Sequence, residues 1–210
     1  MGTLLYVQAS PRNERSHAHA VGAAFLEAYA RDHPADTIVT LDLFARDLPT
    51  FEGAAVRGKY AIMHGDSLSA DESEAWSRVE DMIAEFTRAN KFVFAIPMWN
   101  FGVPYRLKQY LDLIVQPGRT FAFDPATGYR GLMKGKPVLA IYARGGTYEP
   151  GSPSASMDFQ KPYMEAIFRF IGLADPQSII VEPTIHGGPE GARDATDVAI
   201  KSARRLAAQF

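Results

Sequence analysis

The sequence predicts a single α/β domain over residues 1–210, built on a parallel sheet that carries helices on both faces. Five short apolar segments alternate with five longer amphipathic segments, which is typical of repeated strand–helix units. The apolar run at residues 92–96 is continuous, as expected of a strand that is buried on both faces of a parallel sheet. No linker, internal repeat or low-complexity tract divides the chain, so one domain is expected.

The N-terminal part of the chain is expected to form a strand, a helix and a second strand. Residues 4–7 are apolar and end at a cluster of turn residues, which predicts a short buried strand. Apolar side chains then recur at spacings of four and three, which predicts a helix over about residues 16–31. Residues 37–41 are rich in β-branched side chains and predict the next strand. Residues 44–68 show no clear period and are expected to form an extended excursion.

The middle of the chain is expected to supply one helix before the central strand in the sequence and one helix after it. Apolar side chains spaced three, four and three residues apart predict a helix over about residues 70–90, with acidic residues in its first turn. After the strand at 92–96, Pro104 suits the first turn of a helix whose apolar face covers 107–114. Residues 118–135 are expected to form a loop or a small hairpin.

The C-terminal part is expected to complete the sheet. Residues 138–143 predict the fourth strand, and residues 178–181 predict the fifth. Between them, residues 164–171 carry an apolar helix face that Gly172 ends. Apolar side chains spaced along residues 199–210 predict a final helix that includes the last residue of the chain.

The composition excludes several classes of protein. The 22 Lys and Arg residues against 24 Asp and Glu give a net charge of −2, which argues against a nucleic-acid-binding surface. The sequence has no cysteine, which excludes disulfides, thiolate metal sites and cysteine nucleophiles; His17 and His19 do not share a helix face, so no metal site is expected. No apolar stretch is long enough to span a membrane, and the N-terminus lacks a signal-peptide pattern. A cytoplasmic protein is therefore expected.

Ligands of such sheets bind at the carboxyl ends of the strands, so the loops after strands one, three and four are the candidate site. The loop at residues 10–17 opens a helix, and free backbone N–H groups at a helix start suit a phosphate. The alternative is an ordinary strand–helix turn in which Ser16 is the N-cap.

The other two loops suit a planar ligand. Residues 97–104 place Trp, Asn and Phe at a strand end, where aromatic walls and backbone donors could hold an aromatic ring; a packed loop is the alternative. Residues 143–147 contain paired glycines, which let backbone N–H groups approach a ligand closely; a plain turn is the alternative. The three loops together favour one ligand site, because the fold would bring them to a single crevice.

These loops and three further segments carry motifs in a fixed order along nearly the whole chain. The motifs are Ala9-Ser10-Pro11-Arg12 with Glu14-Arg15-Ser16, Pro97-Met98-Trp99-Asn100-Phe101, Gly118-x-Thr120-Phe121, Leu132-x-Lys134-Gly135-Lys136, Arg144-Gly145-Gly146 and Phe170-Ile171-Gly172. The chain thereby resembles the flavodoxin-like, FMN-dependent NADH:quinone oxidoreductases known as azoreductases. It departs from them at Trp99, where Tyr is common, and at Ala143, where Ser is common.

The resemblance implies a flavodoxin-like sheet in the strand order 2-1-3-4-5 and a bound FMN. The implied FMN contacts are Ser10, Ser16 and His17 at the phosphate, Pro97, Met98, Trp99, Asn100 and Phe101 along the ring, and Ala143, Arg144, Gly145 and Gly146 at the pyrimidine edge. Backbone N–H groups of Gly145 and Gly146 would stabilise the negative charge of the reduced ring. The cofactor would carry the chemistry, so no catalytic side chain is required.

The resemblance also implies a ping-pong oxidoreductase. NADH or NADPH would reduce FMN and leave, and a quinone or azo compound would then take two electrons in the same space. It implies a homodimer with the site at the subunit interface, where we expect Phe121 or part of residues 44–68 to form a substrate wall. The alternatives are a flavodoxin-like electron carrier and a non-catalytic flavin-binding protein; the net charge of −2 is less acidic than a typical carrier.

Overall fold

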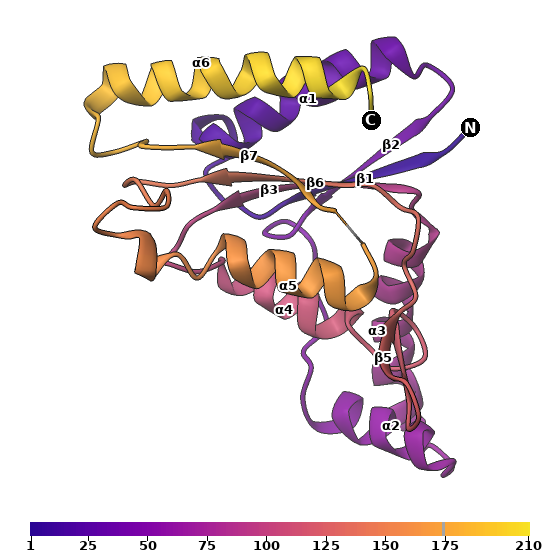
Figure 1. Cartoon of the computed structure of the whole chain (residues 1–210). Helices are drawn as coiled ribbons and strands as arrows, with labels where there is room; N and C mark the ends of the chain where they lie inside the picture. The colour runs from indigo at the N-terminus through magenta and orange to yellow at the C-terminus, as the bar shows by residue number, and fades with distance from the viewer. Residues whose placement is uncertain (174) are drawn as a thin grey trace.

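A five-stranded parallel sheet in the order β2-β1-β3-β6-β7 lies at the centre of the molecule (Figure 1). The structure is a computed structural model that describes residues 1–173 and 175–210. The strands of this sheet are β1 (Thr3–Gln8), β2 (Thr37–Asp42), β3 (Lys91–Pro97), β6 (Val138–Ala143) and β7 (Gln177–Val181). The parallel α/β sheet predicted from the sequence is confirmed.

The predicted strand order 2-1-3-4-5 needs a correction, because the chain contains two more strands than were counted. Strands β4 (Phe121–Asp124) and β5 (Gly128–Gly131) pair with each other in an antiparallel hairpin and not with the main sheet. They come before the fourth strand of the sheet, which is therefore β6, and the edge strand is β7. Of the two possibilities for residues 118–135, the hairpin is the correct one.

Helices cover both faces of the sheet, as Figure 1 shows. Helices α1 (His17–Asp32) and α6 (Gly188–Ala207) pack together on one face. Helices α3 (Ala70–Arg88), α4 (Tyr105–Ile114) and α5 (Lys161–Ile171) cover the other face. Among the residues that the structure describes, no helix has the length and apolar character needed to cross a membrane.

Burial on both faces of the sheet explains why residues 92–96 of the central strand β3 are continuously apolar. Phe92, Phe94 and Ile96 contribute to the core beneath α3, α4 and α5. Val93 and Ala95 point the other way and join the core beneath α1 and α6. Each face of the strand is thus buried under its own helical layer, which leaves no position for a polar side chain.

Local signals in the sequence account for two helix boundaries. Helix α3 begins with a capping box, in which Ser69 Oγ accepts a hydrogen bond from the Glu72 backbone N–H and the Glu72 carboxylate accepts one from the Ser69 N–H. Helix α5 ends at Gly172, whose φ of 97° lies in the left-handed region that favours glycine. The predicted end of α5 is confirmed.

The expectation of an extended excursion at residues 44–68 was wrong, because this segment contains helix α2 (Gly53–His64). Helix α2 packs on α3 and not on the sheet, so it has no apolar stripe of the usual width. A Cβ at Gly58 would lie 3.0 Å from the Glu72 carbonyl oxygen, so this glycine permits the close approach of the two helices. Tyr60, Ile62 and Met63 remain exposed.

The final helix also differs from its predicted extent. Helix α6 begins at Gly188, after the loop that follows the edge strand β7. The first half of this helix is largely polar. It ends at Ala207, so Phe210 lies beyond the helix. The Phe210 ring is nevertheless buried, with its centroid 5.2 Å from that of Phe25 in α1. The apolar spacing therefore reflected burial of Phe210 and not its membership of the helix.

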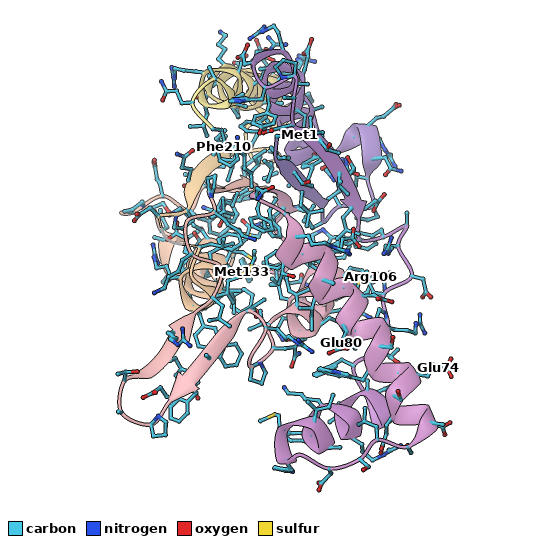
Figure 2. All side chains as sticks on the ribbon, turned by 90° about the vertical axis from the view of Figure 1, so that its right-hand side faces the viewer. Met1, Glu74, Glu80, Arg106, Met133 and Phe210 are labelled. Carbon is cyan, nitrogen blue, oxygen red and sulfur yellow. The ribbon has the colours of Figure 1, made fainter. Side chains whose placement is uncertain are left out.

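The β4–β5 hairpin projects from the same end of the molecule as α2 (Figures 1 and 2). It rests on the C-terminal end of α5, where a Cβ at Gly131 would collide with the backbone of Gly172. The Met133 N–H donates to the Ile171 carbonyl oxygen, 2.8 Å away. Because β7 begins shortly after α5 ends, the hairpin lies at the amino ends of the strands.

Candidate functional site

The loops after β1, β3 and β6 meet at the carboxyl edge of the sheet. The Ala9 N–H donates to the Ala95 carbonyl at 3.0 Å, and the Met98 N–H donates to the Ala143 carbonyl at 2.8 Å. The Arg144 N–H in turn donates to the Val181 carbonyl at 3.0 Å. The strand ladder therefore continues past each strand end and places the candidate loops side by side, where the fold predicts a ligand crevice.

The first loop combines buried hydroxyls with the N-terminus of α1. Ser10 is buried, and its Oγ accepts a hydrogen bond from the Arg12 N–H at 3.3 Å. Ser16 is the N-cap of α1, with its Oγ accepting from the His19 N–H at 3.4 Å. Ser16 thus has the capping role that was the alternative to a phosphate contact, and this role is compatible with a helix start that favours an anion.

The ring of His17 is held away from a simple phosphate contact. Its Nδ1 lies 2.9 Å from the Thr196 hydroxyl oxygen, and that hydroxyl donates to the Ala192 carbonyl at 2.7 Å. The hydroxyl proton is thus used, so Nδ1 carries the imidazole proton in the neutral ring. Burial, together with the nearby Arg12 charge, lowers the pKa of His17. A neutral ring of this tautomer leaves the backbone N–H as the donor that His17 offers an anion.

The second loop is a strained two-residue turn. Trp99 and Gly102 exchange backbone hydrogen bonds of 3.0 and 2.9 Å, which closes what we call the 99–102 turn. Asn100 and Phe101 have φ values of 47° and 68°, a left-handed conformation that is rare for residues other than glycine. The Phe101 side chain is 42% exposed, although it is aromatic. Strain and an exposed ring at one turn are typical of a ligand-binding segment.

An aromatic cluster borders this turn. The Trp99 ring centroid lies 5.8 Å from that of Phe44 and 6.2 Å from that of Tyr105. The Phe101 ring faces Tyr148 with a centroid distance of 6.4 Å. Phe44 belongs to residues 44–68, part of which was expected to form a substrate wall. Tyr148 had not been expected at the site; it follows a sheet strand in the sequence, which is the signal that could have identified it.

The third loop is a glycine cradle against the chain that follows β7. The Gly145 carbonyl accepts from the N–H groups of Ile185 and His186, at 3.1 and 3.0 Å. A Cβ at Gly146 would lie 3.1 Å from Cε1 of His186, and one at Gly145 would lie 3.0 Å from Cδ1 of Ile185. The absence of side chains at these two glycines therefore lets Ile185 and His186 pack directly against the backbone of the third loop. His186, which the sequence analysis did not single out, thus lies against the backbone of Gly146.

Arg144 differs from its neighbours in the third loop. Its backbone carbonyl accepts from the Thr184 N–H and hydroxyl, and its guanidinium is buried, with 1% of the side chain exposed. The guanidinium contacts Asp158, Gln160 and Glu182, none of which the sequence had singled out. Because loss of any one partner would leave a buried charge uncompensated, the guanidinium ties the third loop to the segments that carry these partners.

Phe121 lies far from these three loops within its own chain. It is a residue of the β4–β5 hairpin, and its ring centroid is 4.7 Å from that of Phe170 near the end of α5. The hairpin lies at the amino ends of the strands, whereas the loops lie at the carboxyl ends. Any contact between Phe121 and a ligand in the crevice would therefore need a second copy of the chain.

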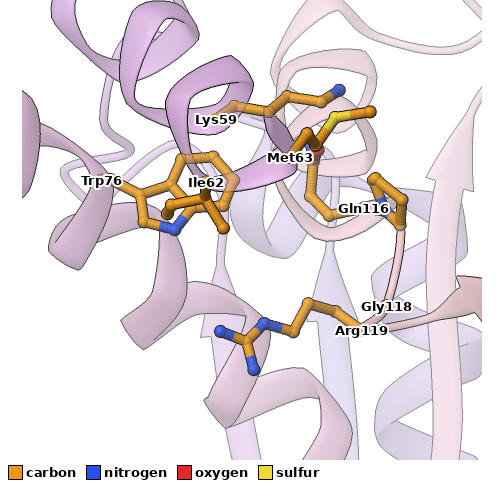
Figure 3. A pocket seen from close by; sticks show the side chains of 8 residues that line it. Lys59, Ile62, Met63, Trp76, Gln116, Gly118 and Arg119 are labelled. Carbon is orange, nitrogen blue, oxygen red and sulfur yellow. The ribbon is translucent and has the colours of Figure 1, made fainter. Parts of the chain in front are cut away.

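A separate pocket lies near the hairpin, between α2, α3 and residues 116–119 (Figure 3). It has a volume of about 220 Å³ and is bordered by Ile62 and Met63 of α2, Trp76 of α3 and Gln116. The charged groups of Lys59 and Arg119 stand at its margin. This pocket shares no residue with the three loops.

The carboxyl edge provides two kinds of chemistry. The α1 N-terminus with Ser10 and Ser16 suits a dianionic group such as a phosphate monoester. The 99–102 turn and the glycine cradle offer aromatic surface and backbone donors, which suit a planar heterocycle. Across residues 1–173 and 175–210, no group of three His, Asp or Glu side chains is arranged to hold a metal ion.

Comparisons with known proteins agree on the whole chain. A family model described as a flavodoxin-like fold matches residues 2–206. An FMN-dependent NADH:quinone oxidoreductase from Nitratidesulfovibrio vulgaris (strain DP4) is 48% identical over 210 residues, and the match covers 100% of both proteins.

Two solved structures are also similar. The crystal structure of an azoreductase from Bacillus anthracis str. Sterne has a TM-score of 0.92 and 29% sequence identity, and covers 100% of both chains. An FMN-dependent NADH-azoreductase from Bacillus anthracis str. Ames Ancestor, solved in complex with FMN, has a TM-score of 0.88 and 28% identity, and covers 99% of this chain and 100% of that chain.

Proposed function

The chain belongs to the FMN-dependent NADH:quinone oxidoreductases of flavodoxin-like fold, and from this we propose that it transfers electrons from NADH to quinones and aromatic azo compounds through FMN bound at its carboxyl edge. For a quinone the balance is NADH, a proton and the quinone giving NAD⁺ and the hydroquinone. Bound FMN supplies the hydride and electron transfer between the two substrates. The protein's own residues bind, orient and shield the reacting groups.

The observation that carries this proposal is the glycine cradle beside a helix N-terminus. Gly145 and Gly146 lack side chains and pack their backbone against Ile185 and His186, at the same edge of the sheet at which α1 begins. A phosphate at one end and a flat ring at the other are the two parts of FMN. The residues present therefore fit this cofactor.

The phosphate end would be held by donors of the first loop. Ser10 and Ser16 supply hydroxyl groups, and the first turn of α1 supplies unpaired backbone N–H groups, including that of His17. The helix dipole adds a favourable field for the negative charge. The Ser16 hydroxyl can donate to a phosphate oxygen while it accepts from the His19 N–H.

The ring end would be held by the second and third loops. Pro97 and Met98 lead from β3 into the 99–102 turn, in which Asn100 and Phe101 present left-handed backbone. Backbone N–H groups of such a turn and of Gly145 and Gly146 can donate to ring nitrogen and oxygen atoms. Ala143 ends β6 beside them and contributes a small wall without a hydroxyl.

We also propose that the protein is a homodimer, with the hairpin of one copy over the crevice of the other. Exposed aromatic side chains support this: Tyr105 and Phe159 lie at the crevice, whereas Phe123 and Tyr129 lie on the hairpin. In this arrangement Phe121 and α2 of one copy form part of the substrate wall of its partner. A cytoplasmic location, which we propose as well, would give the enzyme access to the cellular NADH pool.

Anaerobic reduction tests the proposed function directly. The protein is loaded with FMN, oxygen is removed and NADH is added while the yellow flavin absorbance is followed. We expect rapid bleaching that a quinone then reverses, with NADH consumed in equal amount. Bound FMN that NADH does not bleach would instead indicate an electron carrier, and failure to bind FMN would exclude the proposed site.

A further inference from the structure

One buried guanidinium joins three segments of the candidate site. Arg144 Nη2 donates to Asp158 Oδ2 at 2.8 Å, and Nε donates to Gln160 Oε1 at 3.1 Å. Nη1 donates to Glu182 Oε2 at 3.4 Å. Asp158 and Gln160 precede α5, whereas Glu182 follows β7, so a single side chain in the third loop holds both segments.

The same network extends to β3 and the 99–102 turn. Gln160 is fully buried, and its Nε2 donates to the Ile96 carbonyl at 3.2 Å. Because Nε2 donates to a carbonyl, Oε1 is the amide atom that faces Arg144. The neighbouring Phe159 N–H donates to the Phe101 carbonyl at 3.0 Å. Arg144 is therefore connected, through residues 159 and 160, to the loop on the other side of the crevice.

The surroundings of Arg144 leave little freedom in this network. Its side chain is 1% exposed, and the two carboxylates that it contacts are each 11% exposed. The rings of Tyr142 and Tyr148 lie against the guanidinium, at 5.6 and 5.8 Å from ring centroid to Cζ. The Tyr148 N–H also donates to Glu182 Oε2 at 3.2 Å. A planar fork with several directed donors fits these partners, whereas a lysine would supply one point charge.

We propose that Arg144 is a positioning residue for the proposed FMN site, which sets the spacing between the 99–102 turn and the Gly145–Gly146 cradle. The inference rests on the proposed function. The Arg144 guanidinium is bound to protein groups and does not itself reach a ligand. It acts through Gln160 on one loop and through its own backbone on the other, so that both sets of backbone donors keep a separation that fits one flat ring.

Two properties of the flavin should depend on this spacing. A cradle that shifts relative to the turn would lose hydrogen bonds to the ring, and FMN would bind more weakly. Donors at the pyrimidine edge stabilise the negative charge of the reduced ring more than they stabilise the neutral oxidised ring. Loss of their alignment should therefore lower the flavin midpoint potential, which a change in overall stability alone would not do.

The test compares two network variants with a matched control. Arg144→Lys keeps the charge but not the fork, and Gln160→Met keeps the length and volume of the side chain but not its polar atoms. Arg169→Lys is the control, because Arg169 is an exposed arginine of α5 that pairs with Glu165. FMN dissociation constants are measured by fluorescence titration, midpoint potentials by redox titration, and folding by circular dichroism.

We expect both network variants to bind FMN about tenfold more weakly, as the loss of one backbone hydrogen bond to the ring predicts, and to have a lower midpoint potential. The control should match the wild type within about twofold. Folded variants with unchanged FMN affinity and potential would overturn the proposal and leave Arg144 a purely structural residue. If Arg144→Lys does not fold, Gln160→Met decides. If the wild type itself binds no FMN, the proposed function fails as well.

Discussion

Single residues in the 99–102 turn have conformations that their side chains disfavour. Asn100 and Phe101 both have positive φ, a region that asparagine tolerates better than phenylalanine does. The positive φ of Phe101 and the exposure of its aromatic ring each lower the stability of the fold. Such a residue is retained in a fold when its ring contacts a ligand or a partner.

The strain at Phe101 predicts that glycine is more stable than alanine at this position, which is the reverse of the order in a regular helix. Phe101→Gly should be more stable than Phe101→Ala by about 1 kcal/mol, because glycine adopts positive φ without a Cβ clash. Urea unfolding of the FMN-free variants measures the difference. The same pair at Val198, within α6 and exposed, should show the opposite order, with alanine the more stable. Equal stabilities at position 101 would disprove strain there.

The two roles of Ser16 can be separated by substitution. Ser16→Asp preserves an N-cap oxygen, so its free energy of unfolding should stay within about 0.5 kcal/mol of the wild type, whereas Ser16→Ala should lose about 1 kcal/mol. FMN affinity should follow a different order. The aspartate charge repels a phosphate, so Ser16→Asp should bind FMN at least about tenfold more weakly than Ser16→Ala. Tighter binding by the aspartate variant would place the phosphate elsewhere.

Sequence reasoning at this scale identified loops better than it identified contacts. Ser16 was predicted to bind a phosphate, with an N-cap role as the alternative; the structure shows the N-cap, and the phosphate contact stays a prediction. Arg144 was grouped with the glycines that follow it, but the partners of its guanidinium lie 14, 16 and 38 residues further along the chain. No local pattern reports such distant partners, so this buried network could only be found in three dimensions.

At the scale of elements, the start of the chain is tied to the rest by one carboxylate. Asp36, in the turn between α1 and β2, accepts hydrogen bonds from the Tyr29 hydroxyl at 2.6 Å and from the Gly2 N–H at 2.5 Å. Lys91 at the start of β3 lies 3.4 Å from the same carboxylate. The Tyr29 and Gly2 hydrogen bonds, together with the Lys91 charge, hold the pKa of Asp36 down to about 2.

This depressed pKa predicts how stability responds to acid. The stabilisation by Asp36 is present above its unfolded pKa, which is about 4, and is lost as the pH falls through about 2. Asp36→Asn should therefore be less stable than the wild type at pH 6, and the two stabilities should converge between pH 4 and pH 2. Thermal unfolding as a function of pH measures this. A gap that is constant with pH would refute it, and Asp197→Asn in α6 is the control.

The docking of the hairpin on α5 depends on Gly131. Gly131→Ala would drive a Cβ into the backbone of Gly172, so one of the two elements must shift, at a cost of roughly 1–3 kcal/mol in the free energy of unfolding. Gly191→Ala in α6 is the matched control, since its Cβ would meet nothing within 4 Å and should raise stability. Chemical denaturation of both variants measures the effect. A neutral Gly131→Ala would mean that the hairpin is not seated on α5.

Elements that face the sheet were predictable, and those that do not were missed. Helix α3 was expected near its observed position, because burial against a sheet enforces regular apolar spacing. Helix α2 was missed, because it packs on another helix and buries only Ala55 and Gly58 among its residues. The first half of α6 was missed although this helix does pack on the sheet, because the side chains that it buries there, Ala192 and Thr196, are small or polar.

For the whole molecule, the distribution of exposed apolar side chains is uneven. One group borders the carboxyl edge of the sheet, where Phe101, Tyr105 and Phe159 are exposed. The other lies at the amino end, on the hairpin and α2 (Figure 2). A two-fold dimer can cover both groups at once, because each interface then contains the carboxyl edge of one copy and the hairpin of the other.

A charge placed on the hairpin tests this dimer. Phe123 is 59% exposed in the single chain, and Phe123→Glu would bury a carboxylate in the proposed interface. We expect light scattering to detect a dimer for the wild type and a shift toward monomer for the variant. Val198 in α6 is 63% exposed and distant from the hairpin, so Val198→Glu should leave the mass unchanged. A wild-type monomer would exclude the arrangement.

The separation of hairpin and crevice has a genetic consequence. In the proposed dimer, a lesion in the Gly146 cradle and a lesion in the hairpin damage the same site only when they occur on different subunits. Two inactive alleles of these kinds should therefore complement each other when they are expressed in one cell. Random pairing would make half of the dimers mixed, each with one intact site, so about a quarter of the wild-type activity should return.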